Sequence, residues 1–286
     1  MFKLDPNMQL GYVQLRVLNL DTQKDFYKTL GFQLLEETAS RVVFGAGSDE
    51  PLLILERQDN TVPRPPRSTG LFHFAILVKS VDDLAYVIGH LAQRGIRFSG
   101  AGDHLYSEAF YLTDPEGNGI EIYHDRPKSE WTINADGTIE TDTLPVDVEA
   151  ILARFNPQSE WTGFPNGTIL GHMHLNVSYL DDALKHLYFD ALGFDFKTNF
   201  HNSAYFISAG GYHHHIAMNT WNGQGAPLPP AESSGLIGYS LNLSSREALD
   251  ALRQNLIAQQ VAFEDDDTQL VVKDVNGHDM VFHVKH

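Results

Sequence analysis

A tight turn between two strands carries residue types suited to chemistry. The segment Asp114–Gly117, with the sequence DPEG, is typical of a tight turn, because proline and glycine favour the backbone angles that such a turn needs. Tyr111 precedes the turn and Glu121 follows it, so both side chains can face one cavity. Alternation places Glu121 opposite the apolar Ile120 and Ile122, where a carboxylate is costly unless it binds a cation or hydrogen-bond donors. The alternative is a glutamate at the rim of the sheet, exposed to solvent.

Histidine is the second chemically notable residue type. The chain has 14 histidines, including the run His213–His215, and no cysteine. The absence of cysteine excludes disulfides, thiolate metal sites and a cysteine nucleophile. In the segment GHMHLNV, which begins at Gly171, alternation places His172, His174 and Asn176 on one face of a strand, and Met173, Leu175 and Val177 on the other.

Four repeats of one unit are expected to position these residues. Each repeat reads as a strand, a helix and three further strands, over residues of about 8–60, 70–125, 169–222 and 235–286. The helix of the second repeat, VDDLAYVIGHLAQRG, is expected to begin after Ser80 as its N-cap. We therefore expect alternating strands with one ligand-facing side, covered on the other side by amphipathic helices.

The repeats divide the chain into two halves. Residues 1–125 form an N-terminal half of two modules, residues 126–168 a linker, and residues 169–286 a C-terminal half of two modules. The linker contains one candidate helix, VDVEAILARF. Two Pro-rich segments, Thr61–Ser68 and Gly225–Ser234, separate the modules within each half.

Composition excludes several kinds of partner. The 286 residues are 42% hydrophobic, which supports a folded core, and carry a net charge of −17. Such a charge repels phosphate backbones and anionic membrane surfaces, so we expect no nucleic-acid or membrane partner. No apolar stretch approaches the length of roughly 18 residues that a membrane span needs, and MFKLDPNMQLGY lacks the apolar region of a secretory signal. We expect a cytoplasmic protein; the sequence leaves open whether it forms a homo-oligomer.

The segment Gly102–Glu121 resembles the signature of the type I extradiol ring-cleavage dioxygenases, which belong to the vicinal oxygen chelate superfamily. Every specified position of the signature is filled, by Gly102, His104, Phe110, Tyr111, Asp114, Pro115, Gly117 and Glu121. The four βαβββ repeats resemble the same superfamily over nearly the whole chain. The resemblance implies an α+β fold in which four modules pair into two open eight-stranded barrels, with a metal in a hollow.

The same resemblance implies the metal ligands, two imidazoles and one carboxylate, which is the usual set for non-haem Fe(II). His73 in the first strand of the second module and Glu121 in its fourth strand match two of them. If modules one and two paired, the third position would fall at Tyr12, a poor ligand; if modules two and three pair, it falls at His172. We therefore expect His73, Glu121 and His172 as ligands and modules two and three as partners. The alternative is that His172 is structural and another group completes the site.

Three residues are expected to take part in catalysis. By resemblance, His104 and Tyr111 hydrogen-bond the substrate oxygens, and a histidine of the third module handles protons. Alternation favours His215 for this acid–base role, because it places His215 on the more polar face, while alignment with the family also allows His214. Phe110, Phe206 and Trp221 are candidates for the ring pocket, although each could equally pack in the core; no organic cofactor is expected.

The implied activity is cleavage of catechol or a substituted catechol by O₂ at Fe(II), giving a product of the 2-hydroxymuconic semialdehyde type. Mn(II) accepts the same ligands. Two alternatives remain: another metal-dependent glyoxalase-like enzyme, and a non-catalytic small-molecule-binding member of the superfamily.

Overall fold

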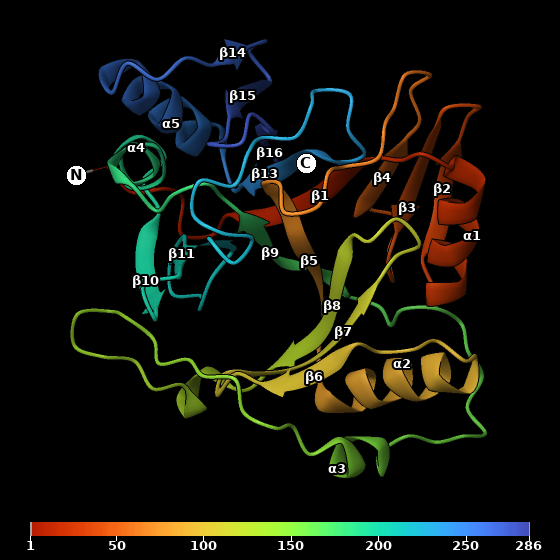
Figure 1. The fold of residues 1–286 in the computed structure, drawn as a ribbon. Helices are drawn as coiled ribbons and strands as arrows, with labels where there is room; N and C mark the ends of the chain where they lie inside the picture. The colour runs from red at the N-terminus through yellow and green to blue at the C-terminus, as the bar shows by residue number, and fades with distance from the viewer. Residues whose placement is uncertain (1, 286) are drawn as a thin grey trace.

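Four modules with the same order of elements build the protein (Figure 1), for which a computed structural model describes residues 2–285. Module one comprises β1 (Gln9–Arg16), α1 (Leu20–Leu30), β2 (Gln33–Glu37), β3 (Arg41–Gly45) and β4 (Leu53–Glu56). Module two comprises β5 (Gly70–Val78), α2 (Val81–Gln93), β6 (Gly100–Asp103), β7 (Ser107–Thr113) and β8 (Gly119–Asp125). Module three comprises β9 (Ile169–Asn176), α4 (Asp182–Lys185), a π-helical continuation (His186–Ala191), β10 (Asp195–Phe200), β11 (Ala204–Ser208) and β12 (Ile216–Asn219). Module four comprises β13 (Gly235–Leu243), α5 (Arg246–Ala258), β14 (Glu264–Asp265), β15 (Gln269–Lys273) and β16 (Asp279–Val284).

The connection between modules two and three is mostly irregular. It contains a 3₁₀ turn, Lys128–Glu130, and the short helix α3 (Val148–Leu152), which packs against α2 (Figure 1). Within residues 2–285, no helix has the length and apolar character to cross a membrane.

Local signals in the sequence set the ends of the helices. The Ser80 side chain accepts a hydrogen bond from the backbone N–H of Asp83, so the predicted N-cap of α2 is confirmed. Helix α1 ends at Gly31, whose φ of 99° is the left-handed conformation that glycine adopts without strain.

The strands form two eight-stranded sheets, each shared by two modules. One sheet has the order β10-β11-β12-β9-β5-β8-β7-β6 and therefore combines modules three and two. The other has the order β14-β15-β16-β13-β1-β4-β3-β2 and combines modules four and one. The α+β class and the pairing of module two with module three are thus confirmed. The sheet of modules two and three curls in the manner of a half-barrel (Figure 1). Residues of both modules line a hollow on one side of it.

The two faces of this curled sheet differ, because one packs on the hydrophobic core and the other lines the hollow. Phe74 and Ile76 of β5 join the main core, as do Met173 and Leu175 of β9. Burying an aliphatic or aromatic side chain of this size stabilises the fold by about 1.5–3 kcal/mol. Because side chains alternate along a strand, the residues next to these core residues face the hollow. They include His73 on β5 and His174 and His172 on β9, the last as predicted.

Candidate metal centre

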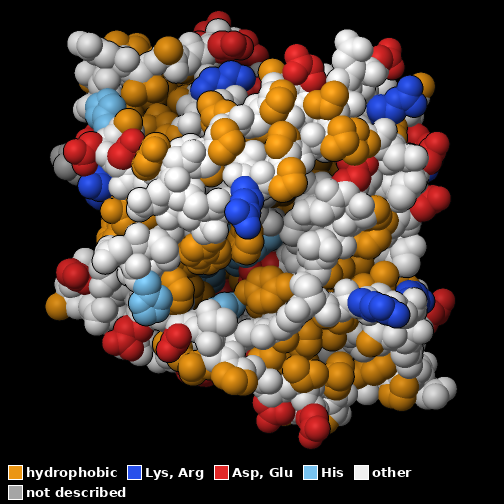
Figure 2. All heavy atoms as spheres, viewed as in Figure 1, with side chains coloured by type: hydrophobic (Ala, Val, Ile, Leu, Met, Phe, Trp, Pro, Cys, Tyr) orange, Lys and Arg blue, Asp and Glu red, His pale blue; other side chains and the backbone are white. Residues whose placement is uncertain are grey.

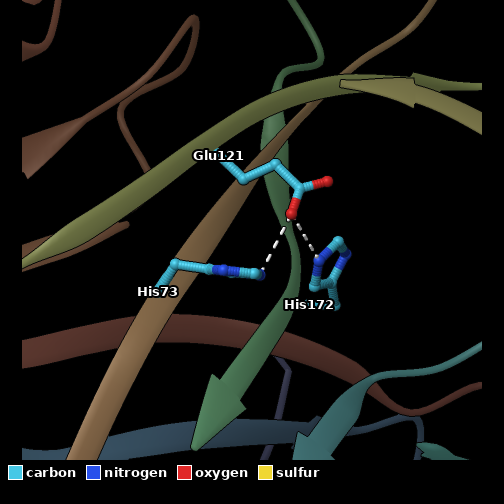
Figure 3. Close-up of side chains that lie close together, drawn as sticks. All are labelled: His73, Glu121 and His172. Atoms are coloured by element: carbon cyan, nitrogen blue, oxygen red, sulfur yellow. Dashed lines mark hydrogen bonds and ion pairs between the residues drawn. The ribbon is translucent and has the colours of Figure 1, made fainter. Parts of the chain in front are cut away.

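Three adjacent strands bring together the candidate ligands. His73 lies on β5, Glu121 on β8 and His172 on β9, and β5 is hydrogen-bonded to both of its neighbours. Ala75 is the register partner of Glu121 on one side and of His172 on the other. Since the alanine side chain is small, the space above Ala75, between Glu121 and His172, stays open. His73 lies two residues before Ala75 on the same face of β5, and its side chain reaches into this space (Figure 3).

The three side chains converge on one point. The Nε2 atom of His73 lies 3.0 Å from Oε2 of Glu121, and Nε2 of His172 lies 3.2 Å from the same oxygen. One donor atom from each residue lies within 4.8 Å of the other two, and all three side chains are buried. Among residues 2–285, no other group of three His, Cys, Asp or Glu side chains has this spacing. The structure therefore brings together the three residues predicted to bind a metal.

The polar chemistry of the cluster suits a divalent cation. Glu121 is only 2% exposed, and of the described residues that line its cavity none is Lys or Arg. Nε2 of His73 is buried without a hydrogen bond, although it points at the carboxylate (Figure 3). A buried carboxylate beside two imidazole nitrogens fits the two-histidine, one-carboxylate set of non-haem metal sites.

The electrostatics keep Glu121 and His172 in the protonation states that bind a metal. Burial by itself would raise the pKa of Glu121, but His172 and His73 outweigh this and hold the pKa well below its ordinary value. Burial lowers the pKa of His172 to about 4, against the opposing effect of Glu121. An ionised carboxylate and a neutral imidazole are the forms that bind metals.

Glycine and the DPEG turn position Glu121. Gly119 pairs with His73, and a Cβ atom at residue 119 would lie 2.1 Å from the carbonyl oxygen of Phe72, so only glycine fits. Asp114 is buried and accepts hydrogen bonds from the backbone N–H groups of Glu116 and Asn118. The signature turn therefore fixes the start of β8, two residues before Glu121.

A cavity of about 260 Å³ opens over the cluster. Figure 2 shows the hollow from outside, with histidine and acidic atoms at its base and hydrophobic side chains around its mouth. Phe206 and Trp221 line it as predicted, together with Phe72 and Phe200. Phe110, the third candidate, packs in the main core, which was the alternative considered for it, because alternation on β7 turns its side chain away from the cavity.

His104 and Tyr111 form a hydrogen-bonded pair in the cavity wall. Nε2 of His104 lies 2.5 Å from the Tyr111 hydroxyl, and Nδ1 of His104 donates to the backbone carbonyl of Asp142 at 2.9 Å. With Nδ1 carrying the proton, Nε2 accepts from the tyrosine hydroxyl. Burial raises the pKa of Tyr111 well above its ordinary value, so the hydroxyl stays protonated. Both residues, which the sequence analysis expects to hydrogen-bond the substrate, line the cavity.

The histidine run is arranged differently from the prediction. His214 lines the cavity and His215 does not. His215 is buried on the other side, where its Nδ1 accepts from the backbone N–H of Ala209 at 3.2 Å and lies 3.1 Å from the Ser208 hydroxyl. The expectation that His215 faces the substrate is therefore wrong. The expectation assumed that side chains alternate along His213–His215 as in a strand. The run precedes β12, so this alternation does not apply to it.

Some cavity residues had no role in the sequence analysis. His174 was placed on the same face as His172, and its ring lies 5.1 Å from that of His73 and 4.9 Å from that of Trp221. Thr141 and Thr143 enter the cavity from the irregular connection after module two, for which the sequence offered no signal.

Comparisons with known proteins agree with the repeats and the signature. Residues 9–122 match the family described as Glyoxalase/Bleomycin resistance protein/Dioxygenase superfamily. The chain is 41% identical over 286 residues to the catechol-2,3-dioxygenase of Bacillus subtilis (strain 168), with 99% of each chain covered.

Solved structures share the fold at low sequence identity. A putative dioxygenase from Bacillus subtilis subsp. subtilis str. 168 has a TM-score of 0.60 and 12% identity, covering 99% of this chain and 86% of that one. Glyoxalase I from Zea mays has a TM-score of 0.57 and 13% identity, covering 97% of this chain and 92% of that one. The family and the clustered ligand atoms together indicate a metal cofactor. The chain belongs to the Glyoxalase/Bleomycin resistance protein/Dioxygenase superfamily, within which it is an extradiol dioxygenase of the catechol-2,3-dioxygenase type.

Proposed function

We propose that this enzyme cleaves catechol or a substituted catechol with O₂ beside the diol, giving a 2-hydroxymuconic semialdehyde-type product. The observation that carries the proposal is the convergence of His73, Glu121 and His172 at the base of an aromatic-lined cavity. The 41% identity to a catechol-2,3-dioxygenase over the full chain supports the same reaction.

His73, Glu121 and His172 would hold Fe(II), with Mn(II) as the alternative that the same ligands accept. When bound, the metal supplies a Lewis-acidic and redox-active centre at which the diol and O₂ react together. The three side chains come from adjacent strands of one sheet, so they approach from the floor of the hollow and leave its open side to the substrate.

The cavity wall supplies the groups that handle protons. The Tyr111 hydroxyl donates to His104 and lines the cavity, so its oxygen would accept a hydrogen bond from a hydroxyl of the substrate. Burial and the neighbouring histidines lower the pKa of His214 well below its ordinary value, so its ring is neutral. A neutral imidazole can accept a proton from a catechol hydroxyl and return it later, which typically contributes about 10²–10⁴-fold to a rate. We assign this role to His214 in place of His215.

The aromatic side chains hold the ring and limit access of water. Phe206 packs edge-on against His214, with ring centroids 4.8 Å apart, and Phe72 packs edge-on against Trp221 at 5.2 Å. Phe72 and Trp221 are 41% and 45% exposed, so they lie at the mouth of the hollow. A flat aromatic substrate fits between such faces.

The test is a turnover assay with defined metal content. Protein purified without oxygen and loaded with Fe(II) is mixed with catechol in air, and O₂ uptake and the yellow ring-opened product are measured. We expect one O₂ consumed per catechol and no turnover by Glu121→Gln. A metal-loaded protein that consumes no O₂ with catechol or alkylcatechols would contradict the proposal.

A further inference from the structure

A chain of three hydrogen-bonded side chains runs from the end of β8 to the cavity. Oδ1 of Asp125, the last residue of β8, lies 2.8 Å from Nε2 of His213. Nδ1 of His213 lies 2.7 Å from Nδ1 of His214. The His214 ring lines the cavity, and its centroid lies 4.2 Å from that of His172. The Asp125 side chain is 20% exposed, so the chain links the surface of the protein to the substrate site.

With His213 neutral, the chemistry of these contacts determines which nitrogen of each ring carries a proton. A carboxylate only accepts hydrogen bonds, so Nε2 of His213 must donate to Asp125. A neutral His213 then has its lone pair on Nδ1, which accepts from Nδ1–H of His214. The remaining nitrogen of His214, Nε2, is left with a lone pair for the cavity. This is the form that a proton acceptor for a catechol hydroxyl requires.

Packing holds the middle ring of the chain in one orientation. His213 is 1% exposed. Its ring stacks on Tyr106 with centroids 4.2 Å apart and planes at 12°, and packs on Tyr212 at 4.0 Å. The Tyr212 hydroxyl is hydrogen-bonded to that of Tyr123 at 2.7 Å, which ties this clamp to β8. A ring held in this way cannot exchange its two nitrogens without unpacking its neighbours.

We propose that Asp125 and His213 are positioning residues that set the orientation and tautomer of His214. The inference rests on the proposed function, because it needs His214 to act on the substrate. In catalytic triads a carboxylate orients the catalytic imidazole directly. Here the imidazole of His213 lies between the carboxylate of Asp125 and the imidazole of His214. Asp125 acts only through His213, and neither residue is among those that line the cavity.

The structure offers a matched control. Glu108 on β7 lies 2.8 Å from Nε2 of His124, so it is also a carboxylate that contacts a histidine on β8. Neither Glu108 nor His124 lines the cavity. Glu108→Ala therefore removes the same kind of contact in the same sheet without touching His214.

The experiment measures kcat, KM and iron content of the Fe(II)-loaded full chain with catechol in air. In His213→Phe, the aromatic packing is kept and both hydrogen bonds are lost; we expect kcat to fall about 10–100-fold, within the range of acid–base catalysis. KM should stay within about threefold and iron content should not change, as for a group that acts on the transition state. His213→Asn, which can offer an acceptor near Nδ1, should recover part of the loss.

A double variant separates positioning from general destabilisation. Since Asp125 acts through His213, Asp125→Ala should lower kcat alone but add nothing to His213→Phe. The inference is overturned if His213→Phe turns over like Glu108→Ala, if the two losses multiply in the double variant, or if the loss of kcat follows a loss of iron. If His214→Ala is impaired and His213→Phe is not, the inference fails and the proposed function stands. If His214→Ala also turns over at the wild-type rate, the proposed role of His214 fails with it.

Discussion

Replacing Glu121 by glutamine tests the metal site with a change of charge and almost none of shape. Glu121 contributes the only carboxylate of the cluster, and Nε2 atoms of both histidines lie 3.0 and 3.2 Å from one of its oxygens. An amide has no net charge to offer a divalent cation. Changes in groups that merely support metal ligands cost about 10–100-fold in affinity, so we expect the loss of this ligand to weaken binding by about 100-fold or more.

The size of the expected Tm shift follows from the coupling between metal binding and folding. Fe(II) at 100 times its Kd stabilises the wild-type protein by about 2.7 kcal/mol, whereas a 100-fold weaker site under the same conditions gains about 0.4 kcal/mol. At about 2 °C per kcal/mol for a chain of this size, iron should raise the Tm of the wild type by about 5 °C and that of Glu121→Gln by about 1 °C.

The assay is thermal unfolding without oxygen, with and without Fe(II). Each protein is compared with its own metal-free form, so changes in intrinsic stability cancel. Glu108→Gln is the control, because Glu108 contacts a histidine outside the cavity and should keep the wild-type shift. A full iron-induced shift in Glu121→Gln would refute the assignment of the carboxylate as a ligand.

Four further predictions follow from the same geometry. His73→Ala and His172→Ala should each lose iron and ring cleavage, whereas Tyr12→Phe should keep both by metal analysis and O₂ uptake; iron loss in Tyr12→Phe would favour a site in module one. His214→Ala should retain iron but lower kcat by about 100-fold, and unchanged turnover would refute its role. His215→Ala should keep kcat within about threefold, since its ring faces away from the cavity. Burial lowers the pKa of His215 to about 3, so below pH 6.5 the unfolded chain takes up a proton that the native state excludes. As the pH falls below 6.5, this residue should lower the free energy of unfolding, measured in urea, by up to about 1.4 kcal/mol per pH unit. His215→Phe should reduce this dependence of stability on pH.

Regular repeats and turn chemistry made much of the fold predictable. The strand–helix–strand order recurs four times because each module must bury one face of its strands, and periodicity records that requirement. The pairing of modules two and three could be predicted because Tyr12 is a poor ligand where His172 is a good one. Residue types at matching positions thus carried information about contacts far apart in the chain.

The errors arose where the backbone leaves a regular strand. Strand alternation was extended to His213–His215, but the run lies before β12, so the structure turns His214 rather than His215 into the cavity. Phe110 and Tyr111 are neighbours on β7, and only the three-dimensional curl of the sheet decides which face is the hollow. Thr141 belongs to a segment without periodicity, whose place depends on packing across modules.

The contact between Asp125 and His213 lies beyond the reach of sequence patterns. The two residues are 88 positions apart, and their pairing follows from the shared sheet and from the loop that delivers the histidine run. The sequence displayed the three adjacent histidines but not the division of labour among them: one in the cavity, one behind it, and one on the far side.

Anomalous scattering at the iron edge, from crystals of Fe(II)-loaded protein grown without oxygen, would locate the metal and show which side chains bind it. We expect one strong peak at the base of the cavity, bound by His73, Glu121 and His172 and by no other side chain. A peak elsewhere in the molecule, or a metal held by only one of these three residues, would contradict this expectation.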